Sequence, residues 1–448
     1  MAEPLRRGLL ARFALDRPAS RAWAMYDWAN SAFMTTIVGA VFPVYFSGVA
    51  AAGLAPEIAQ ERFELTTVAS LVAIALLAPV LGAIADFRAA KKRLLTAFAL
   101  LGIASTAGMF LVDRGEWGLA LLLFALSNVG AAGSFVFYDS LLPHVASPGE
   151  LDRLSTSGYA LGYVGGGVLL ALNLAWILHP GWFGLPAGES LSPAQETLPA
   201  RLAFLSVAVW WLVFTIPLWR RISEPPRRCA PAEVGGARLI AASFRQLRAT
   251  WGELKRFRQA TILLLAFLLY NDGIVTIIRM AAVYAKGKQM ADEIVIVTFL
   301  LVQFVGIPFA FLFGQLAPRF GARRLVLAGL GVYCGISLLA FFMTKNWHFV
   351  ALGLLVSVVQ GGTQALSRSL FASLVPKQKS AEFFAFFAVG EKFAGIFGPL
   401  FFWLVTALSG SAQHAILAVI PFFVVGGLLL GRVDVAGGQR AARLGEGA

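Results

Sequence analysis

The stretch Gly82-Ala-Ile-Ala-Asp86-Phe-Arg88, with Lys91-Lys92 behind it, closes a long apolar run and decides the fold because it occurs twice. The second copy, Gly314-Gln-Leu-Ala-Pro318-Arg319-Phe-Gly321 followed by Arg323-Arg324, closes another apolar run 232 positions later. Self-similarity at a fixed offset is the sequence signature of an internal repeat.

Two further pairs of segments repeat at almost the same offset. Ser140-Leu-Leu-Pro143 matches Ser373-Leu-Val-Pro376, and the glycine pair Gly162/Gly165 matches Gly395/Gly398, both at 233 positions. The chain is therefore predicted to contain two related halves. Two parallel halves around a site at the membrane midplane are typical of secondary transporters.

The composition excludes a set of soluble domains. Hydrophobic residues make up 58% of the 448 residues, charged residues make up 14%, and the mean hydropathy is +0.75. Apolar runs of about 20 residues, long enough to span a bilayer, recur along the chain and lack the period of two that a membrane barrel shows. Helices are expected because backbone groups in lipid must be satisfied locally. We predict twelve spans, at 24–48, 64–86, 93–112, 117–142, 155–178, 202–220, 260–285, 292–315, 322–343, 348–374, 382–405 and 412–431.

The net charge of +13 does not indicate nucleic-acid binding, because its distribution follows the predicted topology. Three basic residues, Arg279, Arg368 and Lys392, lie within spans. Most others lie at the termini and in loops after even-numbered spans, and the loops after odd-numbered spans hold only Arg62, Arg114, Arg201, Lys286, Lys288 and Lys345. Positive loops stay in the cytoplasm, so both termini are predicted to be cytoplasmic. A bacterial inner (plasma) membrane is preferred because the chain is compact, and no cleavable signal peptide is visible.

Three parts of the chain are predicted: an N-terminal six-helix bundle at 1–220, a cytoplasmic linker at 221–259, and a C-terminal six-helix bundle with a short tail at 260–448. From Arg238 the linker has the periodicity of an amphipathic helix on the membrane surface. A solvated linker whose basic residues only set topology is the alternative.

The loop at 179–200 is predicted to hold no regular element. The two cysteines, Cys229 and Cys334, make a disulfide framework implausible.

The repeated stretch resembles the signature loop of the major facilitator superfamily, although the second copy has Pro318 where the acid is expected. A narrower resemblance is to the vacuole effluxer branch, which comprises the autophagy-related vacuolar amino-acid exporters and their bacterial relatives. It rests on Tyr26-Asp-Trp-Ala-Asn-Ser-Ala-Phe33, Tyr270-Asn-Asp-Gly273, Gly158-Tyr-Ala-Leu-Gly-Tyr-Val-Gly-Gly-Gly167 and Gln360-Gly-Gly-Thr-Gln-Ala-Leu-Ser-Arg-Ser-Leu370. The resemblance implies an all-α membrane fold of twelve helices in two pseudo-symmetric bundles, the major facilitator fold. It also implies a monomer that exports amino acids.

Charged residues inside the spans are the candidates for function. A charge at the membrane centre costs about 2.5–3.5 kcal/mol on insertion scales, so such residues usually face a cavity or a partner. In the resembled superfamily the first, fourth, seventh and tenth helices line the cavity. The in-span charges are Asp27, Asp139, Asp272, Arg279, Arg368, Glu391 and Lys392.

Several of these residues are predicted to bind substrate. Asp272 and Arg279, two turns apart in the span 260–285, could hold the ammonium and the carboxylate of a zwitterion; a structural ion pair is the alternative. Gln360 and Gln364 form a polar stripe with Arg368 that suits hydrogen bonding to a substrate, or that joins neighbouring helices. The predicted substrate-binding residues are Asp272, Arg279, Asn271, Gln360, Gln364, Arg368 and Asn30.

A second group is predicted to serve gating or coupling: Asp27, Asp86, Arg88, Asp139 and Glu391. Asp27 could bind a substrate ammonium group, carry a proton, or latch to Arg368, and the latch is favoured. Glu391 is a candidate proton carrier. In the resembled superfamily the acid of the loop after the second span stabilises the outward-open state. Because Pro318 replaces that acid in the second half, Asp86 is expected to do this alone.

The predicted function is secondary active transport by alternating access, in which the bundles rock about a midplane cavity. Amino-acid efflux is favoured, with protons as a candidate coupling ion, a small-molecule substrate and no nucleic-acid partner. One alternative is an exporter of unrelated amphipathic compounds, which the run Phe383-Phe384 with Phe386-Phe387 would suit. Another is a membrane receptor or scaffold that does not transport. No phosphate loop, nucleophile elbow or paired metal-ligand motif is present in the sequence, so no enzyme, cofactor or metal site is predicted.

Overall fold

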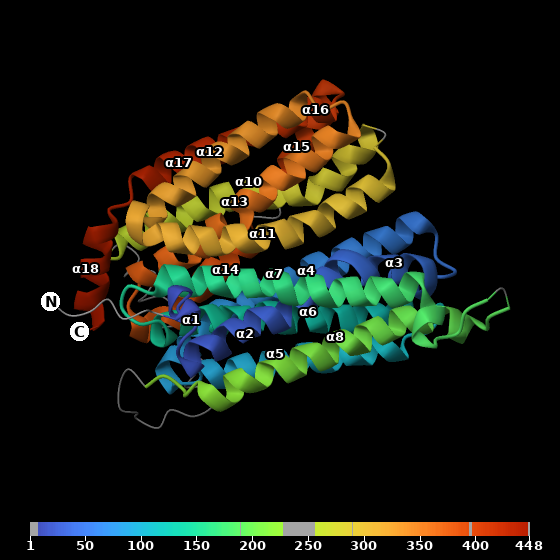
Figure 1. Cartoon of the computed structure of the whole chain (residues 1–448), viewed down its shortest axis with the longest axis horizontal. Helices are drawn as coiled ribbons and strands as arrows, with labels where there is room; N and C mark the ends of the chain where they lie inside the picture. The colour runs from blue at the N-terminus through green and yellow to red at the C-terminus, as the bar shows by residue number, and fades with distance from the viewer. Residues whose placement is uncertain (1–7, 189, 227–255, 289, 394–396, 447–448) are drawn as a thin grey trace.

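The computed structural model describes residues 8–188, 190–226, 256–288, 290–393 and 397–446. In these residues the regular structure is helical, and the long helices form two groups that lie side by side (Figure 1). The amphipathic helix predicted from Arg238, and Cys229, lie outside the described residues.

The N-terminal bundle is built from six membrane-length segments. The first is a continuous run made of α2 (Pro18–Ala32), η1 (Phe33–Val41), α3 (Phe42–Tyr45) and η2 (Phe46–Ala50), with the short α1 (Leu9–Arg12) before it. The others are α4 (Pro56–Arg88), α5 (Lys91–Gly108), α6 (Trp117–Val145), α7 (Leu151–Leu178) and α8 (Pro193–Arg221). All six are long and apolar enough to cross a membrane.

The C-terminal bundle contains α10 (Arg258–Gly287), α11 (Asp292–Phe320), α12 (Ala322–Phe341), α13 (Asn346–Leu374), α14 (Ser380–Phe393), α15 (Phe397–Ser409), α16 (Ala412–Leu417) and α17 (Ile420–Gly431), and α18 (Val435–Glu446) follows it. Together the described residues supply eleven membrane-length spans, five of them in this half. The remaining predicted span, 382–405, is the eleventh along the chain and falls on α14 and α15, on either side of residues 394–396. The prediction of an all-helical membrane protein is confirmed.

Residues 179–200 differ from the prediction that they hold no regular element. Pro180–Phe183 form a 3-10 turn (η4), and α8 already begins at Pro193. The reason is local: Ser192 accepts a hydrogen bond from the backbone of Gln195, whose side chain bonds back to the backbone of Ser192. This capping box and a proline at the first helical position start the helix in a polar segment that hydropathy does not detect.

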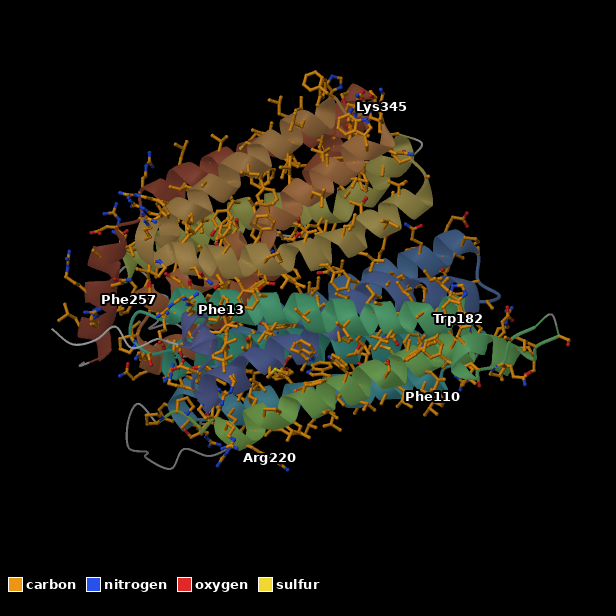
Figure 2. The ribbon with its side chains drawn as sticks, viewed as in Figure 1. Phe13, Phe110, Trp182, Arg220, Phe257 and Lys345 are labelled. Atoms are coloured by element: carbon orange, nitrogen blue, oxygen red, sulfur yellow. The ribbon has the colours of Figure 1, made fainter. Side chains whose placement is uncertain are left out.

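Both chain termini lie at one end of the molecule, which we call the basic end (Figure 1). It also carries the links between α4 and α5, α6 and α7, α11 and α12, and α13 and α14. Phe13, Arg220 and Phe257 lie there, whereas Phe110, Trp182 and Lys345 lie at the opposite end (Figure 2). The ribbons of the two bundles meet at the basic end and diverge towards the other end (Figure 1).

Glycines set the distance between α5 and α6. A Cβ atom added at Gly130 would lie 2.7 Å from the carbonyl oxygen of Phe98 and closer still to the backbone of Gly102. Because backbone atoms cannot move aside as a flexible side chain can, α6 must carry glycine at this crossing. At Gly118, on the same helix, an added Cβ meets nothing within 4 Å.

Gly130→Ala is therefore expected to destabilise the protein by about 1–3 kcal/mol, the usual cost of overpacking a close helix contact. Gly118→Ala is the matched control and should leave stability unchanged. The thermal unfolding midpoints of both variants and the wild type, measured in one detergent, test this. Equal midpoints for Gly130→Ala and the wild type would mean that the crossing is looser than the structure shows.

Candidate functional site

A buried ion-pair network joins the two bundles near the basic end. Arg368 on α13 places Nη1 3.0 Å from Oδ1 of Asp139 on α6 and Nη2 3.3 Å from Oδ2 of Asp27 on α2. Its Nε donates to Oγ of Ser155 on α7 at 2.9 Å, and Nη2 donates to the carbonyl oxygen of Ser155, also at 2.9 Å. The side chains of Arg368, Asp27 and Asp139 are only 4%, 7% and 12% exposed. We call Asp27, Asp139, Ser155 and Arg368 the central latch.

Aromatic rings enclose the guanidinium of the central latch. The Cζ atom of Arg368 lies 4.6 Å from the ring centroid of Tyr159, 4.9 Å from that of Trp23 and 5.5 Å from that of Tyr138. Tyr138 donates its hydroxyl to Oδ2 of Asp27 at 2.8 Å, and Trp23 donates Nε1 to the carbonyl oxygen of Tyr138 at 3.0 Å. The rings exclude water and add cation–π attraction, which strengthens the ion pairs.

The glycine-rich face of α7 allows the central latch to form. A Cβ atom at Gly158 would lie 2.6 Å from Oδ2 of Asp27 and 3.2 Å from Nη2 of Arg368. Further along, a Cβ atom at Gly162 would lie 2.6 Å from Oγ of Ser31. Any larger residue on this face would push α2 away from α7.

A second network lies between the central latch and the chain termini, where α4 and α5 meet the start of α14. Asp86 places Oδ1 2.9 Å from Nζ of Lys91, and its carboxylate accepts the backbone N–H groups of Ala381 at 3.3 Å and Glu382 at 2.8 Å. These amides belong to the first turn of α14, where the helix dipole favours a negative charge. Asp86 therefore fastens the N-terminal bundle to one helix end of the C-terminal bundle.

Lys91 extends this network. Its Nζ lies 2.7 Å from Oγ of Ser380, 3.2 Å from the carbonyl oxygen of Lys377 and 2.8 Å from Nε2 of His144. Ser380 in turn donates to the carbonyl oxygen of Ser140 at 2.9 Å. We call Asp86, Lys91, His144 and Ser380 the outer lock. Within the described residues, every hydrogen bond between the bundles that the structure shows lies in these two networks or beside them, at the basic end.

The structure brings together three residues predicted separately, since Asp27 and Asp139 both contact Arg368, and the predicted Asp27–Arg368 contact is present. Glu391, half-buried on α14, lies near enough for its charge to act on Asp139. Asp86 and Arg88, both predicted gating residues, have different surroundings. Lys91 forms an ion pair with Asp86, and Arg88 is exposed at the end of α4.

The polar pair on α10 stays within the C-terminal bundle. Asn271 and Asp272 are each 1% exposed, and none of their side-chain nitrogen and oxygen atoms has a hydrogen-bond partner among the described residues. Asp272 lies beside Gly398 of α15. Arg279 is exposed and forms no ion pair with Asp272 in the described part of the chain. Asp272 is therefore a buried carboxyl group without an ion-pair partner among the described residues, on which the backbone amide of Gly398 and the charge of Arg279 act.

The remaining predicted residues are distributed over both bundles. Gln364 and Gln360 are half-buried on α13, one and two turns from Arg368 respectively. Asn30, fully buried on α2, donates to Oγ of Ser134 at 3.4 Å, while its Oδ1 has no partner among the described residues. Four residues of the two networks were not predicted from the sequence: Ser155, Tyr159, His144 and Ser380. Only Ser140-Leu-Leu-Pro143 and its repeat at Ser373 pointed to the neighbourhood of the last two.

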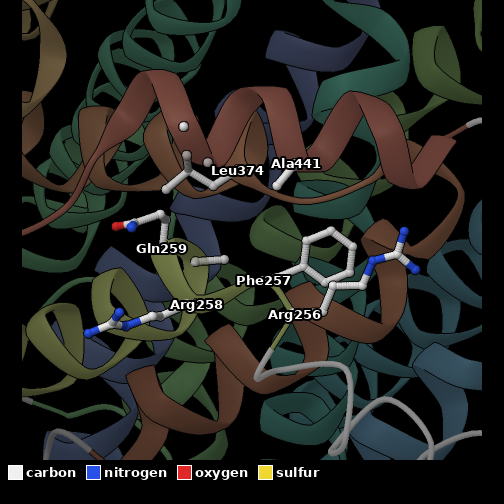
Figure 3. Close-up of a pocket in the computed structure, with 9 residues that line it drawn as sticks. Arg256, Phe257, Arg258, Gln259, Leu374 and Ala441 are labelled. Carbon is white, nitrogen blue, oxygen red and sulfur yellow. The ribbon is translucent and has the colours of Figure 1, made fainter.

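A cavity of about 260 Å³ opens at the basic end (Figure 3). Its lining comes from the approach to α10, the end of α13 and from α18, with Arg256, Phe257, Arg258 and Leu374 among its residues. All of these belong to the C-terminal side of the molecule. The cavity is therefore separate from the central latch, which joins the two bundles.

Comparison with known proteins gives one consistent family. The family model described as "Vacuole effluxer Atg22 like" matches residues 53–443. An uncharacterized MFS-type transporter, YxiO of Bacillus subtilis, is 33% identical over 410 residues, which are 91% of this chain and 93% of that protein. Autophagy-related protein 22-1 of Penicillium rubens is 26% identical over 502 residues, covering 90% of this chain and 81% of that protein.

Solved structures support the same fold. The proton:xylose symporter XylE superposes with a TM-score of 0.69 at 15% identity, covering 93% of this chain and 95% of its own. The transporter FucP superposes with a TM-score of 0.65 at 13% identity, covering 94% of this chain and 99% of its own. At these identities the likeness establishes the fold alone.

Proposed function

Since the chain belongs to the Atg22-like vacuole effluxer family of the major facilitator superfamily, we propose that it exports amino acids or similar small zwitterions from the cytoplasm. It is a multi-pass membrane protein and a secondary transporter rather than an enzyme. The substrate class, the direction of transport and the coupling ion are the parts that we propose.

The two inter-bundle networks support a gate at the basic end. The basic end is assigned to the cytoplasm because Lys and Arg concentrate there. With the central latch and the outer lock formed, the bundles are held together on that side and diverge on the other (Figure 1). Alternating access then requires both networks to break when the bundles rock. Buried ion pairs suit this purpose because their desolvation cost offsets much of their attraction.

The observation that carries the substrate proposal is the buried polar pair on α10, whose side-chain atoms have no close hydrogen-bond partner among the described residues. A carboxyl group buried without a partner is costly, and within a membrane span it is expected to serve a ligand, a proton or an ion. Asp272 would hold the ammonium group of an amino acid, with Asn271 beside it. Arg279, further along α10, would meet the carboxylate as the bundles close.

The phenylalanines that would suit an exporter of amphipathic compounds have another role. Phe384 and Phe387 are almost fully buried and lie against Phe371, and Phe387 also stacks on Phe267 with ring centroids 4.0 Å apart. These rings pack the interior of the C-terminal bundle. They give the amphipathic-compound alternative no specific support.

Asp272→Asn is expected to reduce amino-acid flux at least tenfold, because an amide cannot pair with an ammonium group. The protein would be reconstituted into liposomes, and uptake of a labelled amino-acid mixture measured with and without a proton gradient. Asp16→Asn, the same change at an exposed position near the basic end, is the matched control and should keep wild-type flux. Accumulation driven by the gradient would support proton coupling.

Three outcomes count against parts of this proposal. Absence of amino-acid flux from folded wild-type protein would exclude amino acids as substrates. Binding of amino acids without flux would favour the alternative of a membrane receptor that does not transport. Equal flux in Asp272→Asn and the wild type would leave transport intact and give Asp272 a structural role only.

A further inference from the structure

The hydrogen bond between Lys91 and His144 fixes the protonation state of the imidazole. An ammonium group has three donors and no lone pair, so each of its partners must accept. Nε2 of His144 lies 2.8 Å from Nζ of Lys91 and must therefore present its lone pair. In the closed gate His144 is neutral, with its proton on Nδ1.

The charges that surround His144 oppose a second proton, although the ring also has a hydrogen bond with the backbone of Lys377. The charges that act on the ring are those of Lys91 on α5 and Lys377 in the turn before α14, and both are positive. On α4, the carboxylate of Asp86 already accepts from Lys91 and from two backbone amides of α14. Ser380 lies 3.3 Å from Nε2 and is shared with Lys91.

Two further charged groups lie on the same turn and the start of α14. Lys379 and Glu382 are buried at 3% and 1% exposure and have interactions of their own. Protonation at Nε2 would replace an acceptor with a donor and place a positive charge against the Lys91 ammonium. A proton on Nε2 of His144 is therefore incompatible with the closed outer lock.

We propose that His144 is a proton-binding site that controls the gate at the basic end: a proton taken up at Nε2 displaces Lys91 and favours separation of the bundles. This rests on the proposed function only in that the basic end opens during transport. The proton adds reversibly to the lone pair of Nε2, forming an N–H bond, and is returned to the cytoplasmic side when the gate closes again.

The size and the sign of the effect follow from linkage. The open gate binds the proton with the ordinary histidine pKa of about 6.5 and the closed gate binds none, so a fall in pH favours the open gate. Between pH 7.5 and pH 5.5 the ratio of open to closed molecules should rise about tenfold.

Distance measurement between spin labels tests this without any substrate. Cysteines would replace Arg221 at the end of α8 and Arg324 at the start of α12, in a background with Cys229 and Cys334 changed to serine. Both arginines are exposed, and one lies on each bundle at the basic end. In the labelled protein with His144 unchanged, the ratio of molecules at the longer distance to molecules at the shorter distance should rise about tenfold from pH 7.5 to pH 5.5.

His144→Gln separates this proposal from a general effect of acid. Its amide oxygen can accept from Lys91 but does not titrate, so the closed distance should persist at both pH values. His348→Gln, which changes a histidine at the opposite end of the molecule, should respond as the wild type does.

An unchanged distance ratio in the wild type, or an equal pH response in His144→Gln, would overturn the proposal. Should His144→Gln fail to fold, His144→Asn, whose amide does not titrate either, replaces it with the same expected result and the same grounds for rejection. A pH-dependent opening together with no amino-acid flux would reject the substrate assignment and leave this site in place. Amino-acid flux together with a pH-independent distance would keep the substrate assignment and reject the proton-binding site at His144.

Discussion

Arg368→Gln is expected to abolish transport and to lower the free energy of unfolding by about 3–5 kcal/mol, the usual cost of removing one partner from a buried ion pair. The change leaves the carboxylates of Asp27 and Asp139 facing each other without a counter-charge in a space enclosed by aromatic rings. Chemical or thermal unfolding in detergent and liposome flux measure the two effects.

Two further variants test the physical reason. Arg368→Lys keeps the charge but loses the fork that reaches both carboxylates and Ser155, so it should recover only part of the stability. Combining Arg368→Gln with Asp27→Asn and Asp139→Asn removes the uncompensated charge and should restore stability without restoring transport. Failure of this triple variant to regain stability would mean that lost packing, not charge, causes the defect.

A more exposed ion pair provides the control. Arg17 and Glu150 lie 3.2 Å apart at the basic end, and their side chains are 38% and 19% exposed. Arg17→Gln is expected to cost at most about 1 kcal/mol, as surface pairs do. A loss as large as that of Arg368→Gln would contradict the distinction drawn between buried and exposed pairs.

Asp86→Ala is expected to open the basic end and to destabilise the closed conformation by about 3 kcal/mol or more. The Lys91 ammonium, 4% exposed, would lose its counter-charge, and two amides at the start of α14 would lose their acceptor. The spin-label pair on α8 and α12 should then report a longer distance, even at pH 7.5.

Comparison of two basic residues tests the assignment of Asp86's partner. Lys91→Ala should reproduce most of the effect of Asp86→Ala, whereas Arg88→Ala should have a much smaller effect because Arg88 is exposed. Asp113→Ala controls for the loss of a carboxylate, since Asp113 pairs with Arg201 with its side chain 63% exposed. A larger effect from Arg88→Ala than from Lys91→Ala would show that the outer lock is wrongly assigned.

The fold and the family could be predicted from the sequence because both depend on features that repeat. The stretch at Gly82–Arg88 and its copy at Gly314–Gly321 indicated two related halves, and both the membrane fold and the family are confirmed. Helix ends were less predictable. The span predicted at 64–86 belongs to α4, which begins at Pro56, because charged residues at a membrane surface continue a helix without contributing hydropathy.

The central latch was only partly predictable. Asp27, Asp139 and Arg368 stood out because a charge within an apolar span is costly, and the structure brings all three together. Ser155 and Tyr159 did not stand out, because neutral polar and aromatic residues are common in such helices. Whether these two residues contact Arg368 depends on how α7 packs against α13, and no local sequence pattern predicts that packing.

The direct pairing of Asp272 with Arg279 could not be judged from helical periodicity alone. Seven residues of helix separate the two Cα atoms by about 10.5 Å along the axis, so sharing a face does not bring the charged groups into contact. The structure leaves Asp272 buried and Arg279 exposed. Their joint use in substrate binding stays a prediction that requires a ligand between them.

A reversible disulfide across the basic end tests the central claim most directly. An added Cβ at Gly82 on α4 would lie 3.0 Å from Cβ of Ala385 and 2.6 Å from the carbonyl oxygen of Ala381, both on α14. The two helices must therefore separate slightly, and that separation also brings cysteines at positions 82 and 385 to disulfide spacing. In a background without Cys229 and Cys334, amino-acid flux into liposomes would be measured for the oxidised and the reduced protein. We predict no flux when the two bundles are cross-linked and wild-type flux after reduction; full flux through fully cross-linked protein would contradict the gate at the basic end.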